Sequence, residues 1–132
     1  MNARLLALAT AALVLSCGGP AAVGAERARP ALQTLRAPPN GTWAQVLLGD
    51  RIFHGEHAGG KCSECHGWDA KGTGNGNDLT VGMWIWGDGS LASLKATILH
   101  NMEVAPGMDG SLTGADVDAV AAYVWALGHQ KR

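Results

Sequence analysis

The feature that most constrains this chain is the pentapeptide Cys62-Ser63-Glu64-Cys65-His66. It places two thiols three positions apart, with a histidine directly after the second thiol. One turn of backbone can bring both sulfurs under the two vinyl edges of a porphyrin, and the histidine then points its imidazole at the iron. This spacing predicts that Cys62 and Cys65 attach a c-type haem covalently and that His66 is its proximal iron ligand.

Two other kinds of site share the Cys-x-x-Cys spacing. A thioredoxin-like redox pair opens a helix after a strand, and no βαβ pattern surrounds residues 62–66. A zinc site needs two further cysteine or histidine ligands at suitable spacing, and Cys17 is the only other cysteine. The remaining histidines, which show no paired ligand spacing, are His54, His57, His100 and His129. Haem attachment is therefore the favoured interpretation.

The first residues have the pattern of an export signal. Arg4 supplies a positive charge, and an apolar run follows over residues 5–15. This run falls within the roughly 7–15 residues of a signal peptide and is too short for a bilayer core, which needs about 20. Because bacteria attach c-type haems outside the cytoplasm, export agrees with the haem motif. We therefore expect a periplasmic protein.

Two processing sites compete at the end of this signal. The segment Leu13-Val14-Leu15-Ser16-Cys17 resembles a bacterial lipobox, in which the cysteine becomes the acylated first residue of a lipoprotein. Val23-Gly24-Ala25 has instead the small-residue pattern of ordinary signal peptidase cleavage. We favour the lipobox, because it follows the apolar run directly. It predicts a signal peptide over residues 1–16 and a lipid anchor at Cys17, whereas cleavage after residue 25 would leave a soluble periplasmic or secreted protein.

Residues 17–41 are rich in glycine, alanine, proline and arginine and show little periodicity, which predicts an extended tether. The remaining residues, 42–132, suit one small domain near the size at which a buried core alone is marginal. A covalently held haem would supply much of the missing apolar core. The net charge of −1 comes with no lysine-rich face and no basic stripe for nucleic acid. We expect a monomer that binds no nucleic acid.

Three segments of this domain have helical patterns. Thr42 opens a capping box before an apolar periodic stretch, and a second helix is expected after Ser90. Thr113 is the expected N-cap of the last helix, which Gly128 should end. The apolar stripe of that helix consists of Val117, Val120, Ala121 and Val124. Because residues 71–89 are rich in glycine and have no regular pattern, the domain is predicted to be all-α with long loops.

Over nearly all of residues 45–128 the chain resembles the class I c-type cytochromes, which carry a single haem. In that family an N-terminal helix crosses the C-terminal helix where a glycine permits close approach beside two packed aromatic rings. Gly49, Phe53 and Tyr123 fall at matching positions. The resemblance implies an all-α class I cytochrome c fold, with the N- and C-terminal helices crossing and haem c held between helices and long glycine-rich loops.

Shorter segments resemble a narrower group within that family. Asn77-Asp78-Leu79-Thr80, the run over residues 84–88 and the run over residues 121–125 are similar to cytochrome domains that accompany bacterial membrane-associated dehydrogenases and haem-copper oxidases. The resemblance implies an electron carrier, not an enzyme, that takes single electrons from a dehydrogenase and passes them to an oxidase or a second cytochrome. The alternative is a haem enzyme or a sensor of peroxide, NO or CO, in which the distal methionine is displaced.

The same family places a methionine sulfur on the distal side of the haem, in a loop just before the last helix. Met108 lies in such a loop and is the expected sixth ligand, with Met102 as the alternative and a bis-histidine haem through His100 as a further one. Met83 lies in an apolar run, where packing is the expected role. Relatives follow the ligand with proline, whereas Asp109 stands here, and its carboxylate would favour ferric iron.

Three further residues are expected to contact the haem or its proximal ligand. Relatives have a proline whose carbonyl accepts the N–H of the proximal imidazole. Asn77 stands at that position, and its carbonyl can make the same bond to His66. Trp84 and Trp86 are large residues for a glycine-rich loop. One is expected to pack on the haem and the other to donate its indole N–H to a haem propionate, and the sequence does not say which is which.

Overall fold

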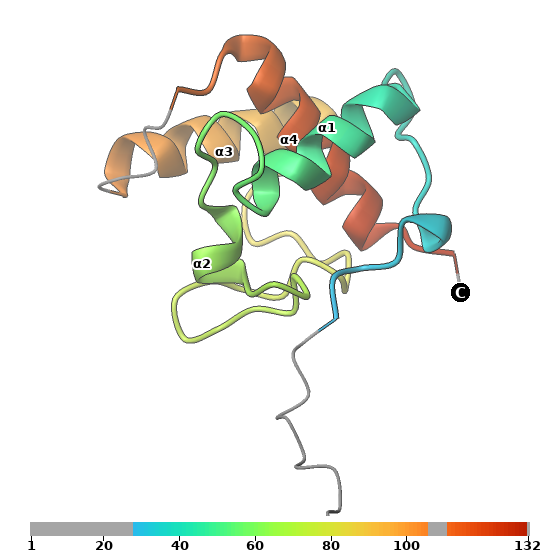
Figure 1. The fold of residues 1–132 in the computed structure, drawn as a ribbon, viewed down its shortest axis with the longest axis horizontal. Helices are drawn as coiled ribbons and strands as arrows, with labels where there is room; N and C mark the ends of the chain where they lie inside the picture. Colours follow the sequence, from blue (N-terminus) through green and yellow to red (C-terminus); the bar gives the residue numbers. More distant parts are fainter. Residues whose placement is uncertain (1–27, 106–110, 132) are drawn as a thin grey trace, which may run out of the picture.

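The computed structural model of the chain describes residues 28–105 and 111–131. The regular elements in these ranges are helices (Figure 1): the 3-10 helix η1 (Leu32–Thr34) and the α-helices α1 (Trp43–Phe53), α2 (Cys62–His66), α3 (Leu91–Val104) and α4 (Gly114–Gly128). Within the described residues there is no strand, only one isolated bridge between Thr73 and Gly76. The predicted all-α class is confirmed.

The three longer helices begin where the sequence predicts. The Thr42 side chain accepts a hydrogen bond from the Gln45 N–H, and the Gln45 side chain accepts one from the Thr42 N–H. The same reciprocal pair joins Thr113 and Asp116 at the start of α4, and the Ser90 side chain caps α3. These bonds satisfy backbone donors that the first turn of a helix leaves without partners, so each start is determined locally.

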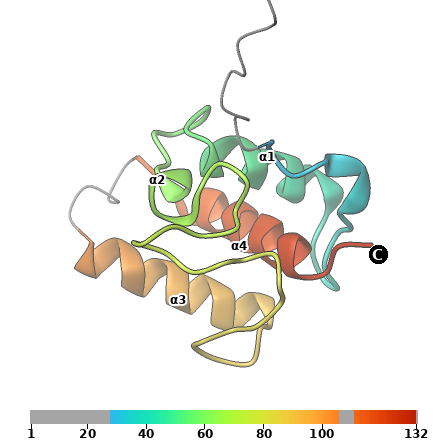
Figure 2. The ribbon, with the colours of Figure 1, turned by 90° about the horizontal axis from the view of Figure 1, so that it is seen from below.

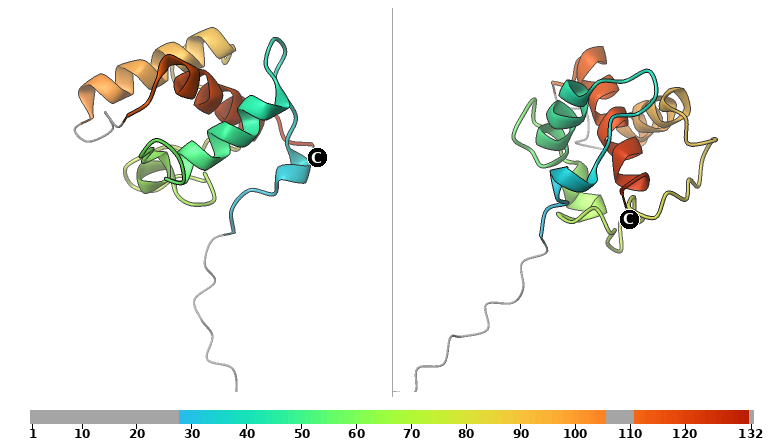
Figure 3. Two further views of the ribbon diagram at one scale, coloured as in Figure 1. Left: turned by 45° about the horizontal axis from the view of Figure 1, so that its top comes forward. Right: turned by 90° about the vertical axis from the view of Figure 1, so that its right-hand side faces the viewer.

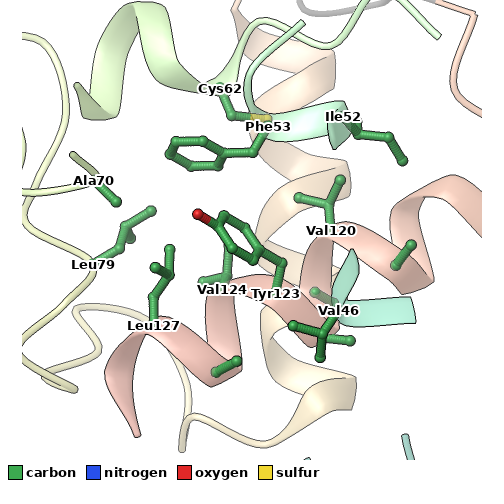
Figure 4. Close-up of a cluster of buried hydrophobic side chains, with 14 of the residues drawn as sticks. Val46, Ile52, Phe53, Cys62, Ala70, Leu79, Val120, Tyr123, Val124 and Leu127 are labelled. Atoms are coloured by element: carbon green, nitrogen blue, oxygen red, sulfur yellow. The ribbon is translucent and has the colours of Figure 1, made fainter. Parts of the chain in front are cut away.

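Helices α1 and α4 cross at Gly49, as the family resemblance implies. A Cβ atom at this position would collide with the Ala119 carbonyl oxygen of α4, so only glycine permits the observed approach. Beside the crossing, the rings of Phe53 and Tyr123 meet edge to face, with centroids 5.4 Å apart and planes inclined by 62°. Both side chains are fully buried (Figure 4). The two aromatic residues therefore pack as the resemblance predicts.

Helix α4 lies at the centre of the domain, because α1 packs on one side of it and α3 on another (Figure 2). The predicted apolar stripe is buried, but burial extends further round the helix than this single stripe. The additional buried apolar residues are Ala119, Ala122, Tyr123, Ala126 and Leu127. A helix that is covered on two sides needs apolar residues around most of its circumference, which explains the difference.

The glycine-rich segment between α2 and α3 is irregular, as predicted for residues 71–89, and lies next to α2 and below α1 and α3 in Figure 1. Two close contacts with the end of α4 require glycine. A Cβ atom at Gly82, whose φ is +68°, would lie 2.6 Å from the Gly128 carbonyl oxygen, and one at Gly128 would lie 2.7 Å from the Trp84 ring. The loop can therefore pack closely against α4 and bring Trp84 to the core.

Residues 28–41, which we call the N-terminal strap, pack on the domain (Figure 3). Leu35 is 3% exposed and belongs to the main hydrophobic core. The Thr34 carbonyl accepts a hydrogen bond of 2.8 Å from the Lys131 N–H. The extended tether expected over residues 17–41 is thus not what the structure has in the strap. Local composition does not reveal this packing, because the partners of the strap are remote in sequence.

The other N-terminal predictions lie outside the described residues and stay predictions. They are the signal peptide over residues 1–16, the alternative cleavage after residue 25 and the acylation of Cys17. Among the helices of the described residues, none has the length and apolar character needed to cross a membrane.

Candidate functional site

A cavity of about 620 Å³ lies between the glycine-rich loop and helices α2, α3 and α4. Apolar side chains from several parts of the chain form most of its wall. They are Phe53 of α1, Leu79 and Trp84 of the loop, Leu94 and Ile98 of α3, and Val120 and Val124 of α4. A cavity with apolar walls and a few placed polar groups is typical of a site for a large hydrophobic ligand or cofactor.

Helix α2 brings the whole attachment motif to this cavity. Cys62, Cys65 and His66 all line it from one helical segment. Cys62 is buried and Cys65 is half-buried, and burial raises the pKa of the Cys62 thiol to about 11. Gly67, with φ of +81°, ends the helix and turns the chain directly after the histidine. The structure therefore gathers at one cavity the three residues of the predicted attachment motif.

The His66 ring is held by the loop behind it. Its Nδ1 lies 2.9 Å from the Asn77 backbone carbonyl oxygen, which is the bond that the family resemblance implies. Because a carbonyl oxygen only accepts, Nδ1 is the donor, and Nε2 is the nitrogen left to bind a metal. Gly76 permits this approach: a Cβ atom there would lie 2.7 Å from the Cys65 carbonyl oxygen and 3.0 Å from His66 Nδ1. The sequence does not single out Gly76, because glycines are frequent throughout this loop.

Trp84 and Trp86 both line the cavity but differ in burial. Trp84 is half-buried and packs on the hydrophobic core, with its ring held against Gly89 and Gly128. Trp86 is 71% exposed. Of the two roles expected for this pair, packing therefore suits Trp84, and the hydrogen bond to a haem propionate stays a prediction for Trp86.

The predicted distal ligand, Met108, lies outside the described residues. The described alternatives are not among the residues that line the cavity: Met102 is half-buried on α3, His100 is exposed, and Met83 is 73% exposed. Residues 104–105 do line it, and they lead directly into the segment that holds Met108. The choice of Met108 stays a prediction, with the start of its loop at the cavity wall.

The residues present fit a cofactor that brings its own iron. Within residues 28–105 and 111–131, no three Cys, His, Asp or Glu side chains converge as a site for a bare metal ion. Two thiols and one imidazole beside an apolar cavity match instead the donor set of a covalently attached haem. Each sulfur can join one vinyl group, the imidazole can ligate the iron, and the apolar walls can enclose the macrocycle.

Comparison with known proteins agrees with this site. Residues 46–128 match the protein family described as Cytochrome c. Curated relatives include the cbb3-type cytochrome c oxidase subunit CcoP of Rhodobacter capsulatus, 38% identical over 77 residues. They also include the cbb3-type subunit FixP of Bradyrhizobium sp. strain ORS 278, 34% identical over 80 residues, and CcoP of Cereibacter sphaeroides, 36% identical over 70 residues.

These alignments cover 51%, 52% and 51% of this chain but only 26%, 27% and 24% of the relatives, in the same order. The chain thus spans about a quarter of the length of the curated relatives that it matches. No solved structure matches it. The family match covers most of the chain, the fold is all-α, and the cavity suits the cofactor. This chain therefore belongs to the cytochrome c family, and covalently bound haem c is its cofactor.

Proposed function

We propose that this chain is an exported electron-transfer protein whose haem c is attached through Cys62 and Cys65 and ligated by His66 and Met108. The observation that carries the proposal is the placement of His66. Its Nδ1 is bound to the Asn77 carbonyl at 2.9 Å, and the ring lines the same cavity as both cysteines. A backbone acceptor behind an iron-ligating imidazole fixes its orientation and raises its basicity.

Held by His66 and Met108, haem c would supply one-electron chemistry between ferric and ferrous iron and would need no substrate at the iron. The remaining requirements fall to the chain itself. The apolar walls of the cavity exclude water, and Trp84 packs among them. Trp86, at the exposed edge of the cavity, offers an indole N–H for a haem propionate.

The partners in this proposal are redox proteins. Similarity to cbb3-type oxidase subunits supports an oxidase or a second cytochrome as the electron acceptor, with a membrane-associated dehydrogenase as the donor. We place the domain in the periplasm on a lipid at Cys17, which would raise its effective concentration near membrane enzymes. Mass spectrometry of the exported protein would then report a diacylglycerol on Cys17. An unmodified N-terminus that begins after residue 25 would instead indicate a soluble protein without the lipid anchor.

The ferric absorption spectrum of the purified protein tests the ligand set. Wild type should show the weak red band of sulfur-to-iron charge transfer. Met108→Ala should abolish this band, and Met102→Ala and the control Met83→Ala should keep it. Loss of the band in Met102→Ala alone would reassign the distal ligand.

Two other results would overturn more of the proposal. A high-spin ferric spectrum in wild type would indicate an open sixth position and favour the haem enzyme or gas sensor. Haem that leaves the protein in acidified organic solvent would refute covalent attachment through Cys62 and Cys65.

A further inference from the structure

A partly buried group of charged side chains, Arg29, Asp50 and His54, lies beside the turn that follows His66. Electron transfer as proposed above makes no use of this group. The guanidinium of Arg29 on the strap forms a bidentate ion pair with the Asp50 carboxylate on α1. The distance from Nε to Oδ1 is 3.0 Å and that from Nη2 to Oδ2 is 2.6 Å. Arg29 Nη1 lies 2.6 Å from Oε1 of Glu56. Asp50 is only 4% exposed, so this bidentate ion pair involves a carboxylate that is largely removed from water.

His54, which follows α1, is the most enclosed member of this group, and its side chain has no exposed surface. Its Nδ1 lies 2.8 Å from the Asp50 backbone carbonyl oxygen and 3.2 Å from Asp50 Oδ1. Its Nε2 lies 2.9 Å from the Trp68 carbonyl oxygen. Carbonyl and carboxylate oxygens only accept hydrogen bonds. Both ring nitrogens must therefore carry protons for both contacts to be hydrogen bonds, which makes the ring an imidazolium.

The charges around His54 agree with this protonation state. Burial alone lowers the pKa of His54, but the bonds to the Asp50 carboxylate and to the two carbonyls outweigh it, so that the pKa is raised. Arg29 opposes the shift by charge repulsion. Burial also acts against ionised Asp50, yet its bonds to His54 and Arg29 keep the pKa of Asp50 below its ordinary value.

Two other titratable groups face this site. Tyr123 packs against His54 from α4, with ring centroids 6.2 Å apart, and burial raises the pKa of its phenol, so it adds no charge. Glu56 lies on the far side of Arg29, where it balances part of the guanidinium charge. The carboxylate that directly neutralises the imidazolium is therefore that of Asp50.

The oxygen bound by His54 Nε2 belongs to the turn that follows the proximal histidine. Trp68 comes two residues after His66, and its ring meets the His54 ring edge to face with centroids 4.5 Å apart. The Arg29 guanidinium lies 5.9 Å from the Trp68 ring centroid. The His66 ring is thus held by Asn77, and the backbone directly after it is held by His54.

We propose that His54 is a positioning residue for the proximal ligand: as a buried imidazolium held by Asp50, which Arg29 binds in turn, it anchors the Trp68 carbonyl and with it the turn that follows His66. This role rests on the proposed function, in which His66 binds the iron. It also assigns a purpose to the strap, because Arg29 lies outside the family match over residues 46–128 and yet supports the haem site.

Proton NMR of the full-length ferric holoprotein tests this role, because the paramagnetically shifted haem methyl resonances report the orientation of the axial imidazole. His54→Leu removes both hydrogen bonds and should change the methyl pattern. His54→Gln can still donate to the Trp68 carbonyl through its amide and should keep the wild-type pattern. His57→Gln, at a more exposed histidine nearby, is the matched control. A wild-type pattern in His54→Leu would overturn the proposal.

Asp50→Asn provides a second test that keeps the imidazole in place, should His54→Leu fail to fold. Without the carboxylate, the pKa of His54 should fall, so that the ring loses a proton at lower pH than in wild type and retains one N–H for two acceptors. The methyl pattern of Asp50→Asn should therefore depend on pH, and Asp50→Asn/His54→Gln should remove that dependence. A pH-independent pattern in Asp50→Asn would overturn the proposal, as would a neutral His54 ring in the nitrogen NMR spectrum of wild type near pH 7.

Failure of this inference and failure of the proposed function look different. If His66 does not bind the iron, wild type itself lacks the resonances of an axial imidazole. If only the role of His54 is wrong, wild type shows those resonances and the His54 variants share them unchanged.

Discussion

Replacing Leu35 by alanine should destabilise the holoprotein as a core substitution does, although Leu35 lies in a segment whose composition predicts a tether. Its side chain is 3% exposed and part of the main core. Burying a leucine contributes about 1.5–3 kcal/mol, and leucine-to-alanine changes in cores cost about 2–5 kcal/mol. The strap can shift inward and fill part of the space that the smaller side chain leaves. We therefore expect the free energy of unfolding to fall by about 2–3 kcal/mol.

Guanidinium unfolding of the holoprotein, followed by circular dichroism, should show this loss as a lower midpoint at an unchanged slope. Leu47→Ala on α1 is the matched control, because that leucine is 36% exposed and its loss should cost less than about 1 kcal/mol. If Leu35→Ala unfolds at the midpoint of wild type, the strap does not pack in solution and the sequence-based tether is correct.

Three further predictions concern Gly49, Gly76 and the dependence of stability on pH. Gly49→Ala should lower the free energy of unfolding by about 1–3 kcal/mol, because the new methyl meets the Ala119 carbonyl and separates α1 from α4; the same unfolding curve measures it. Gly76→Ala should lower the ratio of haem to protein absorbance after purification, because a Cβ there meets the Cys65 carbonyl and the edge of the proximal ring. Stability should be greatest between about pH 4 and 6.5, where the contributions of Asp50 and His54 are both complete. It should fall in acid as pH drops through the lowered pKa of Asp50, and fall in base as pH rises through the raised pKa of His54. Unfolding midpoints across pH measure both losses.

Specific results would contradict each of these. A Gly49→Ala variant as stable as wild type would mean that the helices do not cross as closely as described. Full haem content in Gly76→Ala would mean that the loop approaches the proximal histidine differently. His54→Gln should remove the alkaline loss of stability and keep the acid loss. An alkaline loss of the same size in that variant would show that another group causes it.

Much of the fold is predictable from the sequence because its determinants are local. The Thr42–Gln45 and Thr113–Asp116 capping boxes each operate within one turn, so the sequence predicts the starts of α1 and α4 correctly. The attachment motif also lies within one helical segment. The bond from His66 to the Asn77 carbonyl can be predicted only from the resemblance to a family, because nothing in the local pattern pairs these residues across the loop.

The ion pair of Arg29 with Asp50 and the hydrogen bond of His54 to Trp68 cannot be predicted from local patterns. Arg29 and Asp50 are separated by 21 residues, and His54 and Trp68 by 14. A helical interpretation of residues 43–53 places Asp50 one turn before His54, which is a weak signal for their contact. No pattern in the sequence indicates that Arg29 reaches either of them. Composition alone therefore assigns the strap to a tether.

The sequence by itself determines the helical class, the helix starts and the family, and it indicates where the haem is attached, because these depend on neighbouring residues and on spacing within one turn. Tertiary structure alone decides that residues 28–41 belong to the domain and that His54 is charged in its interior. Burial and ion pairing depend on atoms that only the folded chain brings together, and they set both outcomes.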